Sequence, residues 1–254
     1  MMSNPEKLTE AGAPSSARSP SYASPTLQVW YQTADFLEDP HFMEAYRFAM
    51  GGAAGFLQRI GAVPDVRHEW PVLVGCWAAW HGRHLPGDFV ECGTNTGILS
   101  MAICKYVDFN RLDKFFYLFD TYCGIPSEQM SESEKSLGRE ALSKAVYRDS
   151  FETAQKNFAP FPRVQLVRGK VPDTLPTVPI HRVAYLSIDM NIIFPEIAAL
   201  EYFWDKLSPG APVILDDYGK AKFVEQKCAM DAFSARRGLK ILNLPTGQGL
   251  LIKP

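Results

Sequence analysis

The sequence predicts an α/β fold in which helices cover both faces of a mostly parallel sheet of seven strands. Three observations carry this prediction. From Phe89 onward, short β-rich runs alternate with helical runs, and one strand passes through a glycine-containing turn straight into a helix that begins at Ile98. Strands that alternate with helices pair in parallel, because each helix returns the chain to the same end of the sheet. The last two runs, Ile241–Leu242 and Leu250–Ile252, are close enough to form an antiparallel hairpin at one edge.

The length of the chain and the spread of its apolar segments favour one domain with additions. The 254 residues suffice for one large domain or two small ones, and apolar segments are spread evenly after Phe36. Residues 1–25 are rich in Ser, Pro and Ala and have no apolar middle, so we expect a disordered lead-in there. An N-terminal helical cap over residues 26–84 then precedes the main domain over residues 85–254.

The periodicity of the apolar residues places each element. In the cap, helical spacing predicts one helix between Asp35 and Met50 and another from Glu69 to about His84. In the main domain, the expected strands are Phe89–Cys92, Phe115–Phe119, Val164–Val167, Val183–Ile188, Val213–Leu215, Ile241–Leu242 and Leu250–Ile252. The expected helices are Ile98–Tyr106, Phe151–Phe158, Pro195–Leu207 and Phe223–Arg237.

One polar segment, residues 122–147, interrupts this alternation directly after a strand end. Ligands of open α/β sheets bind outside the carboxyl ends of the strands, so an insertion at this point is well placed as a lid over the site. A solvated surface helix explains the same composition equally well. Both interpretations stay open at the level of the sequence.

Composition excludes several classes of partner. The net charge is −2 and no run of lysine or arginine appears, which argues against a nucleic-acid surface. The five cysteines lie far apart without a C-x-x-C pair, so neither a disulfide framework nor a zinc site is indicated. No apolar run approaches the roughly 20 residues that cross a bilayer, and the N-terminus lacks the pattern of a signal peptide. We therefore expect a cytoplasmic protein that binds neither nucleic acid nor membrane.

The turn from Glu91 to Gly97 is the strongest indication of a ligand. Two glycines, Gly93 and Gly97, allow a tight turn, and the helix after them presents free N–H groups. The pattern departs from the dinucleotide fingerprint, because Asn95 stands where the middle glycine makes room for a pyrophosphate. Glu91 adds a carboxylate two residues before the first glycine, which suits a ligand with a positively charged end such as S-adenosylmethionine. The alternative is an ordinary strand–turn–helix whose glycines serve packing.

Further cofactor contacts are expected at the turn and at the next two strand ends. Asp120 closes the second strand, where an acid can accept both hydroxyls of a ribose, although a turn-forming Asp is the alternative. Arg168-Gly169-Lys170 follows the third strand, where methyltransferases commonly contact adenine. The complete set of expected cofactor-binding residues is Glu91, Gly93, Thr94, Asn95, Gly97, Asp120, Thr121, Gly169 and Lys170.

Two more strands end in acids, Asp189 after one and Asp216-Asp217 after the other. Three carboxylates that lie close together repel one another strongly in a dry site unless protons or a cation offset their charge. Oxygen ligands without a nearby Cys or His select a hard ion such as Mg²⁺, with Ca²⁺ and Mn²⁺ as alternatives. The sequence therefore predicts a metal site formed by Asp189, Asp216 and Asp217. The alternative for one of the paired acids is a helix cap.

Several ordered motifs resemble the macrocin O-methyltransferase family over about Leu85 to Pro254. They are Gly87-Asp88-Phe89-Val90-Glu91-Cys92-Gly93, Phe119-Asp120-Thr121-Tyr122-Cys123-Gly124-Ile125-Pro126, Gly169 through Asp173-Thr174-Leu175-Pro176, Ser187-Ile188-Asp189, and Leu207-Ser208-Pro209-Gly210 through Asp216-Asp217-Tyr218. The resemblance implies a Rossmann-like class I methyltransferase fold, S-adenosylmethionine as cofactor, and Mg²⁺ held by the acids that match Asp189, Asp216 and Asp217. It also implies that Asp189 is the catalytic base and that Glu91 and Asp120 contact the cofactor.

The chain departs from that family in two places. Asn191 and Ile193 stand where members often carry a second acid and a tyrosine, and residues 122–160 contain no histidine, although some members place one in the lid. The resemblance implies methyl transfer to a hydroxyl of a small-molecule acceptor such as a glycoside. A catechol methyltransferase, a non-catalytic protein that binds S-adenosylmethionine and a nicotinamide-dependent oxidoreductase are the competing functions. The sequence leaves the oligomeric state open, with a homo-oligomer as one option.

Overall fold

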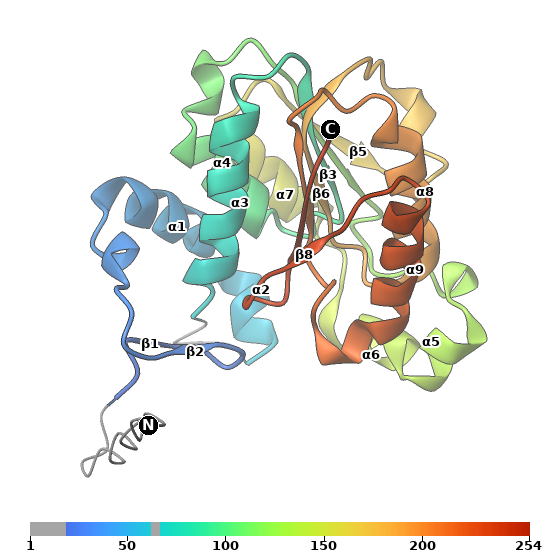
Figure 1. Cartoon of the computed structure of the whole chain (residues 1–254), viewed down its shortest axis with the longest axis horizontal. Helices are drawn as coiled ribbons and strands as arrows, with labels where there is room; N and C mark the ends of the chain where they lie inside the picture. Colours follow the sequence, from blue (N-terminus) through green and yellow to red (C-terminus); the bar gives the residue numbers. More distant parts are fainter. Residues whose placement is uncertain (1–18, 62–66) are drawn as a thin grey trace, which may run out of the picture.

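The computed structural model describes residues 19–61 and 67–254 (Figure 1). The described chain opens with a short antiparallel pair, β1 (Tyr22–Ala23) with β2 (Gln28–Val29). Most of the expected disordered lead-in, residues 1–25, lies outside the described residues. The expectation of disorder does not hold for Tyr22–Ala23, because these residues pair with β2 and the Tyr22 ring is buried.

A seven-stranded sheet in the order β5-β4-β3-β6-β7-β9-β8 forms the centre of the protein. Its strands are β3 (Asp88–Cys92), β4 (Phe116–Asp120), β5 (Val164–Arg168), β6 (Val183–Ile188), β7 (Pro212–Leu215), β8 (Leu242–Asn243) and β9 (Gly249–Ile252). Strands β3 to β7 are parallel, and β9 runs antiparallel to both β7 and β8. The predicted fold class is confirmed, including the antiparallel edge hairpin.

Helices cover both faces of this sheet, as Figure 1 shows with α8 and α9 on one side and α1, α3 and α4 on the other. The helices are α1 (Pro40–Gly52), α2 (Ala54–Arg59), α3 (Glu69–Gly82), α4 (Ile98–Tyr106), α5 (Glu132–Ser136), α6 (Arg139–Val146), α7 (Phe151–Phe158), α8 (Ile193–Trp204) and α9 (Val224–Ala235). Alternate strand residues enter different cores: Phe89 packs on the α3–α4 side and Val90 on the α8–α9 side. Both faces are therefore buried, which is why the strands read as continuous apolar runs.

The predicted boundaries agree closely with the observed ones. Strand β6 and helices α4 and α7 have the predicted bounds, whereas α8 ends at Trp204 rather than Leu207. The expected helix between Asp35 and Met50 begins only at Pro40, because proline favours the first helical position and the Asp39 side chain accepts a hydrogen bond from the next helical N–H.

The chain order of the strands reverses between β3 and β6. Strand β4 follows β3 on one side, and β6 and β7 lie on the other. The loops at the carboxyl ends of β3 and β6 consequently leave in opposite directions and create a crevice, which is where open α/β sheets bind their ligands. The insertion, residues 122–147, begins at the end of β4 and contains α5 and α6, so it starts at the same edge of the sheet.

Candidate active site

A cavity of about 220 Å³ lies at the carboxyl ends of the parallel strands. Residues after β3, β4, β5, β6 and β7 line it, and the cap and the insertion contribute residues too. The predicted site residues in its lining are Glu91, Gly93, Thr94, Asn95, Asp120, Thr121, Gly169, Asp189 and Asp216. Topology thus brings together most of the residues that the sequence assigned to one site.

The glycine turn after β3 is shaped by positive φ angles and close packing. Gly93 has a φ of +94°, and a Cβ there would lie 1.8 Å from the carbonyl oxygen of Asp189. Gly97 has the same φ, and a Cβ would lie 2.5 Å from the Phe158 ring. Only glycine fits either position, so packing alone accounts for both. Gly97 lies behind the turn, outside the cavity lining, while Asn95 enters the lining with a φ of +51°.

The carboxylate of Asp120 braces this turn from the neighbouring strand. Its Oδ2 accepts hydrogen bonds from the backbone N–H groups of Thr94 and Asn95, both at 2.7 Å, and its Oδ1 accepts from the N–H of Tyr122 at 2.6 Å. Hydrogen bonds to a charged acceptor are strong, so these contacts fix the ends of β3 and β4 relative to each other. The predicted ribose contact stays a prediction; the structure adds a second role for Asp120.

Glu91 contributes a buried carboxylate with an unused oxygen. The residue is 3% exposed, lines the cavity, and its Oε2 has no hydrogen-bond partner. Burial raises the pKa of Glu91 to about 8, and the negative charges of Asp120 and Asp216 add to the increase. A buried carboxylate oxygen without a partner is expensive in free energy. The position therefore fits a ligand that brings a positive charge or a hydrogen-bond donor.

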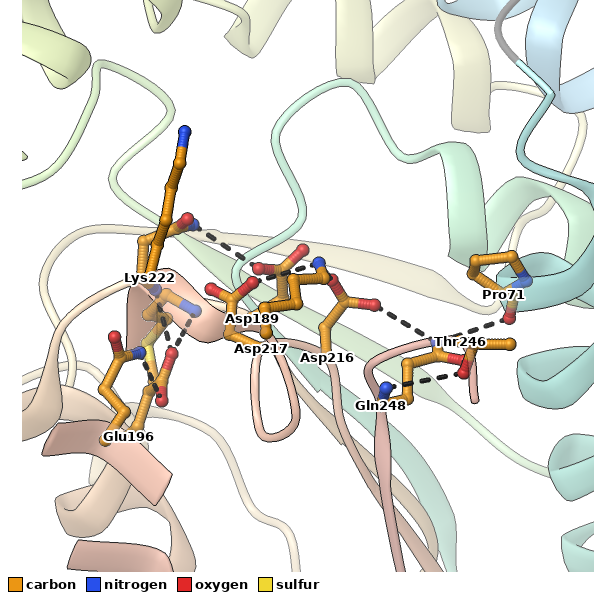
Figure 2. A network of polar contacts seen from close by, with 12 residues as sticks. Pro71, Asp189, Glu196, Asp216, Asp217, Lys222, Thr246 and Gln248 are labelled. Atoms are coloured by element: carbon orange, nitrogen blue, oxygen red, sulfur yellow. Dashed lines mark hydrogen bonds and ion pairs between the residues drawn. The ribbon is translucent and has the colours of Figure 1, made fainter. Parts of the chain in front are cut away.

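At the other end of the crevice the three predicted metal ligands converge. One carboxylate oxygen each from Asp189, Asp216 and Asp217 lies within 4.8 Å of the other two (Figure 2). Asp189 and Asp216 line the cavity, whereas Asp217 lies behind them and has a buried Oδ2 without a hydrogen-bond partner. The donor set of three carboxylates suits a hard divalent ion such as Mg²⁺. The ammonium of Lys220 contacts the cluster. Its Nζ lies 2.6 Å from a carboxylate oxygen of Asp216 and 3.0 Å from one of Asp217.

The three carboxyl groups titrate differently because their surroundings differ. Burial, followed by repulsion from the paired aspartates, raises the pKa of Asp189 far above its usual range. Burial also raises the pKa of Asp217, to about 6, against the effect of Lys220. For Asp216, burial is outweighed by Lys220, which keeps its pKa below the usual value. The most proton-binding member of the cluster, Asp189, is thus the one predicted to act as a base.

Buried polar side chains from distant segments support the acidic cluster (Figure 2). Glu196 of α8 accepts hydrogen bonds from the backbone N–H groups of Met190 and Asn191, at 2.9 and 2.8 Å, and so fixes the loop after Asp189. Gln248 donates to Asp216 at 3.1 Å and to the carbonyl oxygen of Pro71 at 3.3 Å. The cap is thereby tied to Asp216 of the acidic cluster.

Some residues near the cavity were not predictable from local patterns, and the predicted contact of Lys170 with the cofactor stays a prediction. Lys220, Glu196, Gln248 and the cavity-lining His68 were not recognised; a lysine four residues after Asp216 was the single available signal. Lys170 was expected at the cofactor, yet its exposed ammonium pairs with Glu128 of the insertion and lies outside the cavity lining. The side chain leaves the strand end on the solvent side, while its neighbours Gly169 and Val171 both line the cavity.

Comparison with known proteins identifies similar sequences. Residues 73–242 match the family described as Macrocin-O-methyltransferase (TylF). Mycinamicin III 3''-O-methyltransferase of Micromonospora griseorubida is 28% identical over 144 residues, which cover 53% of this chain and 56% of that protein. Demethyldecarbamoylnovobiocin O-methyltransferase of Streptomyces niveus is 31% identical over 148 residues, 54% of this chain and 55% of that protein. The match spans about half the length of these curated relatives.

Solved structures share the fold. The O-methyltransferase NovP superposes with a TM-score of 0.64 at 22% identity, covering 72% of this chain and 79% of NovP. The calicheamicin methyltransferase CalS11 covers 96% of this chain and 99% of its own, with a TM-score of 0.56 and 17% identity. At these identities the likeness establishes the architecture alone. Within the described residues, no helix is both long and apolar enough to cross a membrane.

Proposed function

The chain belongs to the macrocin O-methyltransferase family, and from this premise we propose that it transfers a methyl group from S-adenosylmethionine to a hydroxyl oxygen of a sugar or a sugar-containing natural product. We further propose that Asp189, Asp216 and Asp217 hold Mg²⁺ at the acceptor end of the cavity. A relative from Streptomyces olivaceus that is 29% identical and named as the 4'-O-methyltransferase of a rhamnosyl-tetracenomycin supports a glycoside acceptor for this chain. The acceptor itself is a small molecule rather than a nucleic acid.

One observation carries the proposal. A single cavity joins Glu91, whose buried Oε2 lacks a partner, to the acids Asp189 and Asp216. The first group fits the ammonium of the methionine part of the cofactor, and the second fits a divalent cation. A dinucleotide would instead place a pyrophosphate beside the glycine turn, where Glu91 would repel it. The geometry therefore favours methyl transfer over nicotinamide chemistry.

The residues of the chain position the cofactor and exclude water. When bound, S-adenosylmethionine supplies a methyl group on a positively charged sulfur. Glu91 would pair with its ammonium, the turn at Thr94-Asn95 would lie along the methionine part, and Asp120 would accept the ribose hydroxyls while it braces the turn. Gly169 lines the wall where the adenine would pack. Fixed placement of the two reactants supplies much of the rate in such a transfer.

The acidic end prepares the acceptor hydroxyl. When bound, Mg²⁺ lowers the pKa of an alcohol that it contacts. Asp189 would take the proton from that alcohol at a carboxylate oxygen, since it lies in the cavity lining beside the paired acids. Asp216 and Asp217 keep the cluster negative, and Glu196 holds the loop that carries Asp189.

Aromatic residues from the cap and the insertion form the outer wall of the acceptor end. Phe56 of α2 and Tyr147 after α6 both line the cavity, and their rings stack with centroids 6.5 Å apart. Burial, and then the charges of Asp189 and Asp217, raise the pKa of Tyr147. Flat apolar ring faces beside hydrogen-bonding acids suit a sugar ring, which has both apolar and polar surfaces.

Calorimetry with S-adenosylhomocysteine, with and without Mg²⁺, tests the proposal most directly. We expect this ligand to bind and NADH not to bind, because the turn offers no room for a pyrophosphate. Turnover of a glycoside acceptor that stops on addition of EDTA would establish the metal requirement and would distinguish an enzyme from a cofactor-binding scaffold. Binding of NADH in place of S-adenosylhomocysteine would overturn the assignment, and preferred turnover of a catechol would change the acceptor class.

A further inference from the structure

Lys220 occupies a position among the acids that a divalent ion also requires. Its Nζ lies 2.6 Å from Asp216 Oδ2 and 3.0 Å from Asp217 Oδ1, so one ammonium joins the paired carboxylates. An ion bound by one oxygen from each of the three aspartates would lie in the same small space, because those oxygens are within 4.8 Å of one another. Mg²⁺ binds carboxylate oxygens at about 2.0–2.1 Å, so the ion and the ammonium compete for the charge of the same acids.

We propose that Lys220 is a resident counter-ion that competes with the divalent cation for the three acids, so that metal binding requires the lysine side chain to swing out of the cluster. This inference rests on the metal role proposed above for Asp189, Asp216 and Asp217. Removal of the lysine therefore strengthens metal binding, although it deletes no metal ligand and adds none.

Charge balance gives the physical reason for a resident cation. Three carboxylates around a buried point repel one another, and an uncompensated charge in that environment is strongly destabilising. One ammonium lies 2.6 Å from Asp216 Oδ2 and 3.0 Å from Asp217 Oδ1. It thus offsets the charge of the paired acids and holds them together while no metal is bound.

The stem of Lys220 is seated by the hairpin on the other side of the cluster. Gly247 has a φ of +87°, and a Cβ there would lie 2.9 Å from Cγ of Lys220. The backbone N–H of Gly219 donates to the carbonyl oxygen of Gly247 at 2.7 Å, which holds the hairpin against the turn that carries the lysine. The absence of a side chain at Gly247 therefore makes room for the lysine stem.

The Lys220 ammonium can leave the cluster for solvent. The Lys220 side chain is 36% exposed, so its flexible four-carbon stem reaches solvent without unfolding of its surroundings. After it leaves, Asp217 offers two oxygens instead of one, because its buried Oδ2 has no hydrogen-bond partner. The exchange replaces one positive charge with two at a cluster of three acids, which favours the divalent ion once its concentration is sufficient.

Binding of Mn²⁺, followed by the electron paramagnetic resonance signal of the free ion, tests the competition without reference to turnover. We expect Lys220→Met to bind Mn²⁺ at least about tenfold more tightly than the wild type, the fold-change that corresponds to about 1.4 kcal/mol. The matched control is Lys227→Met. Lys227 is 35% exposed and pairs with Asp231 at 2.6 Å in the same i,i+4 arrangement, yet away from the three acids. Its replacement should leave Mn²⁺ affinity unchanged.

A measurement on the wild type covers the case in which Lys220→Met does not fold. Reductive methylation, read by peptide mass spectrometry, should label Lys220 severalfold faster with saturating Mg²⁺ than without it, while Lys227 is labelled equally in both. Equal or weaker Mn²⁺ binding by a folded variant, unchanged or slower labelling of Lys220, or no metal binding at all would each overturn the inference. Binding of S-adenosylhomocysteine, measured in parallel, reports separately on the proposed function.

Discussion

The two ends of the cavity are organised by different forces. At the cofactor end, backbone N–H groups of the glycine turn surround one carboxylate, Asp120, and every contact is made within β3, β4 and the segments that follow them. At the acceptor end, three carboxylates are held together by one lysine and by side chains from α8 and the edge hairpin. The first end is fixed by hydrogen bonds to the main chain and the second by charge balance. Replacement of an acid by its uncharged amide should therefore affect the two ends differently.

Asp189→Asn should produce the largest effect and confine it to the acceptor end. The substitution removes the proposed proton acceptor and one metal ligand, so we expect kcat to fall by about 10³-fold. The affinity for S-adenosylhomocysteine should change little, because the glycine turn keeps its contacts. Steady-state kinetics and calorimetry measure the two quantities. Asp205→Asn, at an exposed position beyond α8, is the control; turnover above a tenth of the wild-type value in Asp189→Asn would contradict the assignment.

Asp120→Asn should weaken binding at the cofactor end and leave the acceptor end unchanged. Both carboxylate oxygens now accept hydrogen bonds from backbone N–H groups. In the variant, the amide nitrogen is itself a donor and cannot accept the hydrogen bond at its position. Loss of a charged acceptor costs about 1.5–3 kcal/mol, so affinity for S-adenosylhomocysteine should fall by about 30-fold. Mn²⁺ binding to the acids should persist. Asp113→Asn, an exposed carboxylate before β4, controls for charge alone, and an unchanged calorimetric affinity in Asp120→Asn would show that the brace is dispensable.

Glu91→Gln should change how cofactor affinity depends on pH. Burial raises the Glu91 pKa to about 8 in the free protein, and the group must ionise to pair with an ammonium. Cofactor affinity should therefore rise as the pH increases through about 8 in the wild type, by about tenfold between pH 7 and pH 9 beyond the rise seen in the variant. Calorimetry at several pH values gives this difference. Identical pH profiles for the two proteins would exclude Glu91 as the partner of the ammonium.

The same substitution should also change how the stability of the free protein depends on pH. Because the folded-state pKa of Glu91 is raised, its contribution to stability is complete below about pH 4.5 and is lost as the pH rises through about 8. Thermal unfolding of the free protein should thus depend less on pH in Glu91→Gln than in the wild type over this window. Glu152→Gln, an exposed carboxylate in the first turn of α7, should retain the wild-type dependence.

Glu134→Gln should give the smallest effect, because it loosens the insertion without removing a site residue. Glu134 of α5 accepts hydrogen bonds from the N–H of Ile193 at 2.7 Å and of Ser131 at 2.8 Å, so it caps α8 from a distant segment. Loss of such a cap costs about 1 kcal/mol. We expect the acceptor KM to rise by about threefold at most, with unchanged kcat, and hydrogen exchange in α5 to become faster. Glu132→Gln, exposed on the same helix, should show neither change.

Much of the cofactor end was predictable because its residues are close in sequence. The run from Glu91 to Gly97 indicated the turn, and helices α4 and α7 have the predicted bounds. The convergence of Asp189 with Asp216 was also predictable, since the carboxyl ends of parallel strands meet at one edge of a sheet. The ion pair of Lys170 with Glu128 was not predictable, because strand periodicity places the Cα and does not place the end of a long, flexible side chain.

The sequence by itself determined the order of strands and helices, the glycine turn and the acids at the strand ends, because each depends on periodicity or on neighbours a few residues apart. Only the tertiary structure decided how those acids are balanced. Gln248 contacts Pro71 across 177 residues, and Glu134 contacts Ile193 across 59. A buried charge takes its stability from whichever groups the fold brings within a few ångströms, and no local pattern records which groups those are.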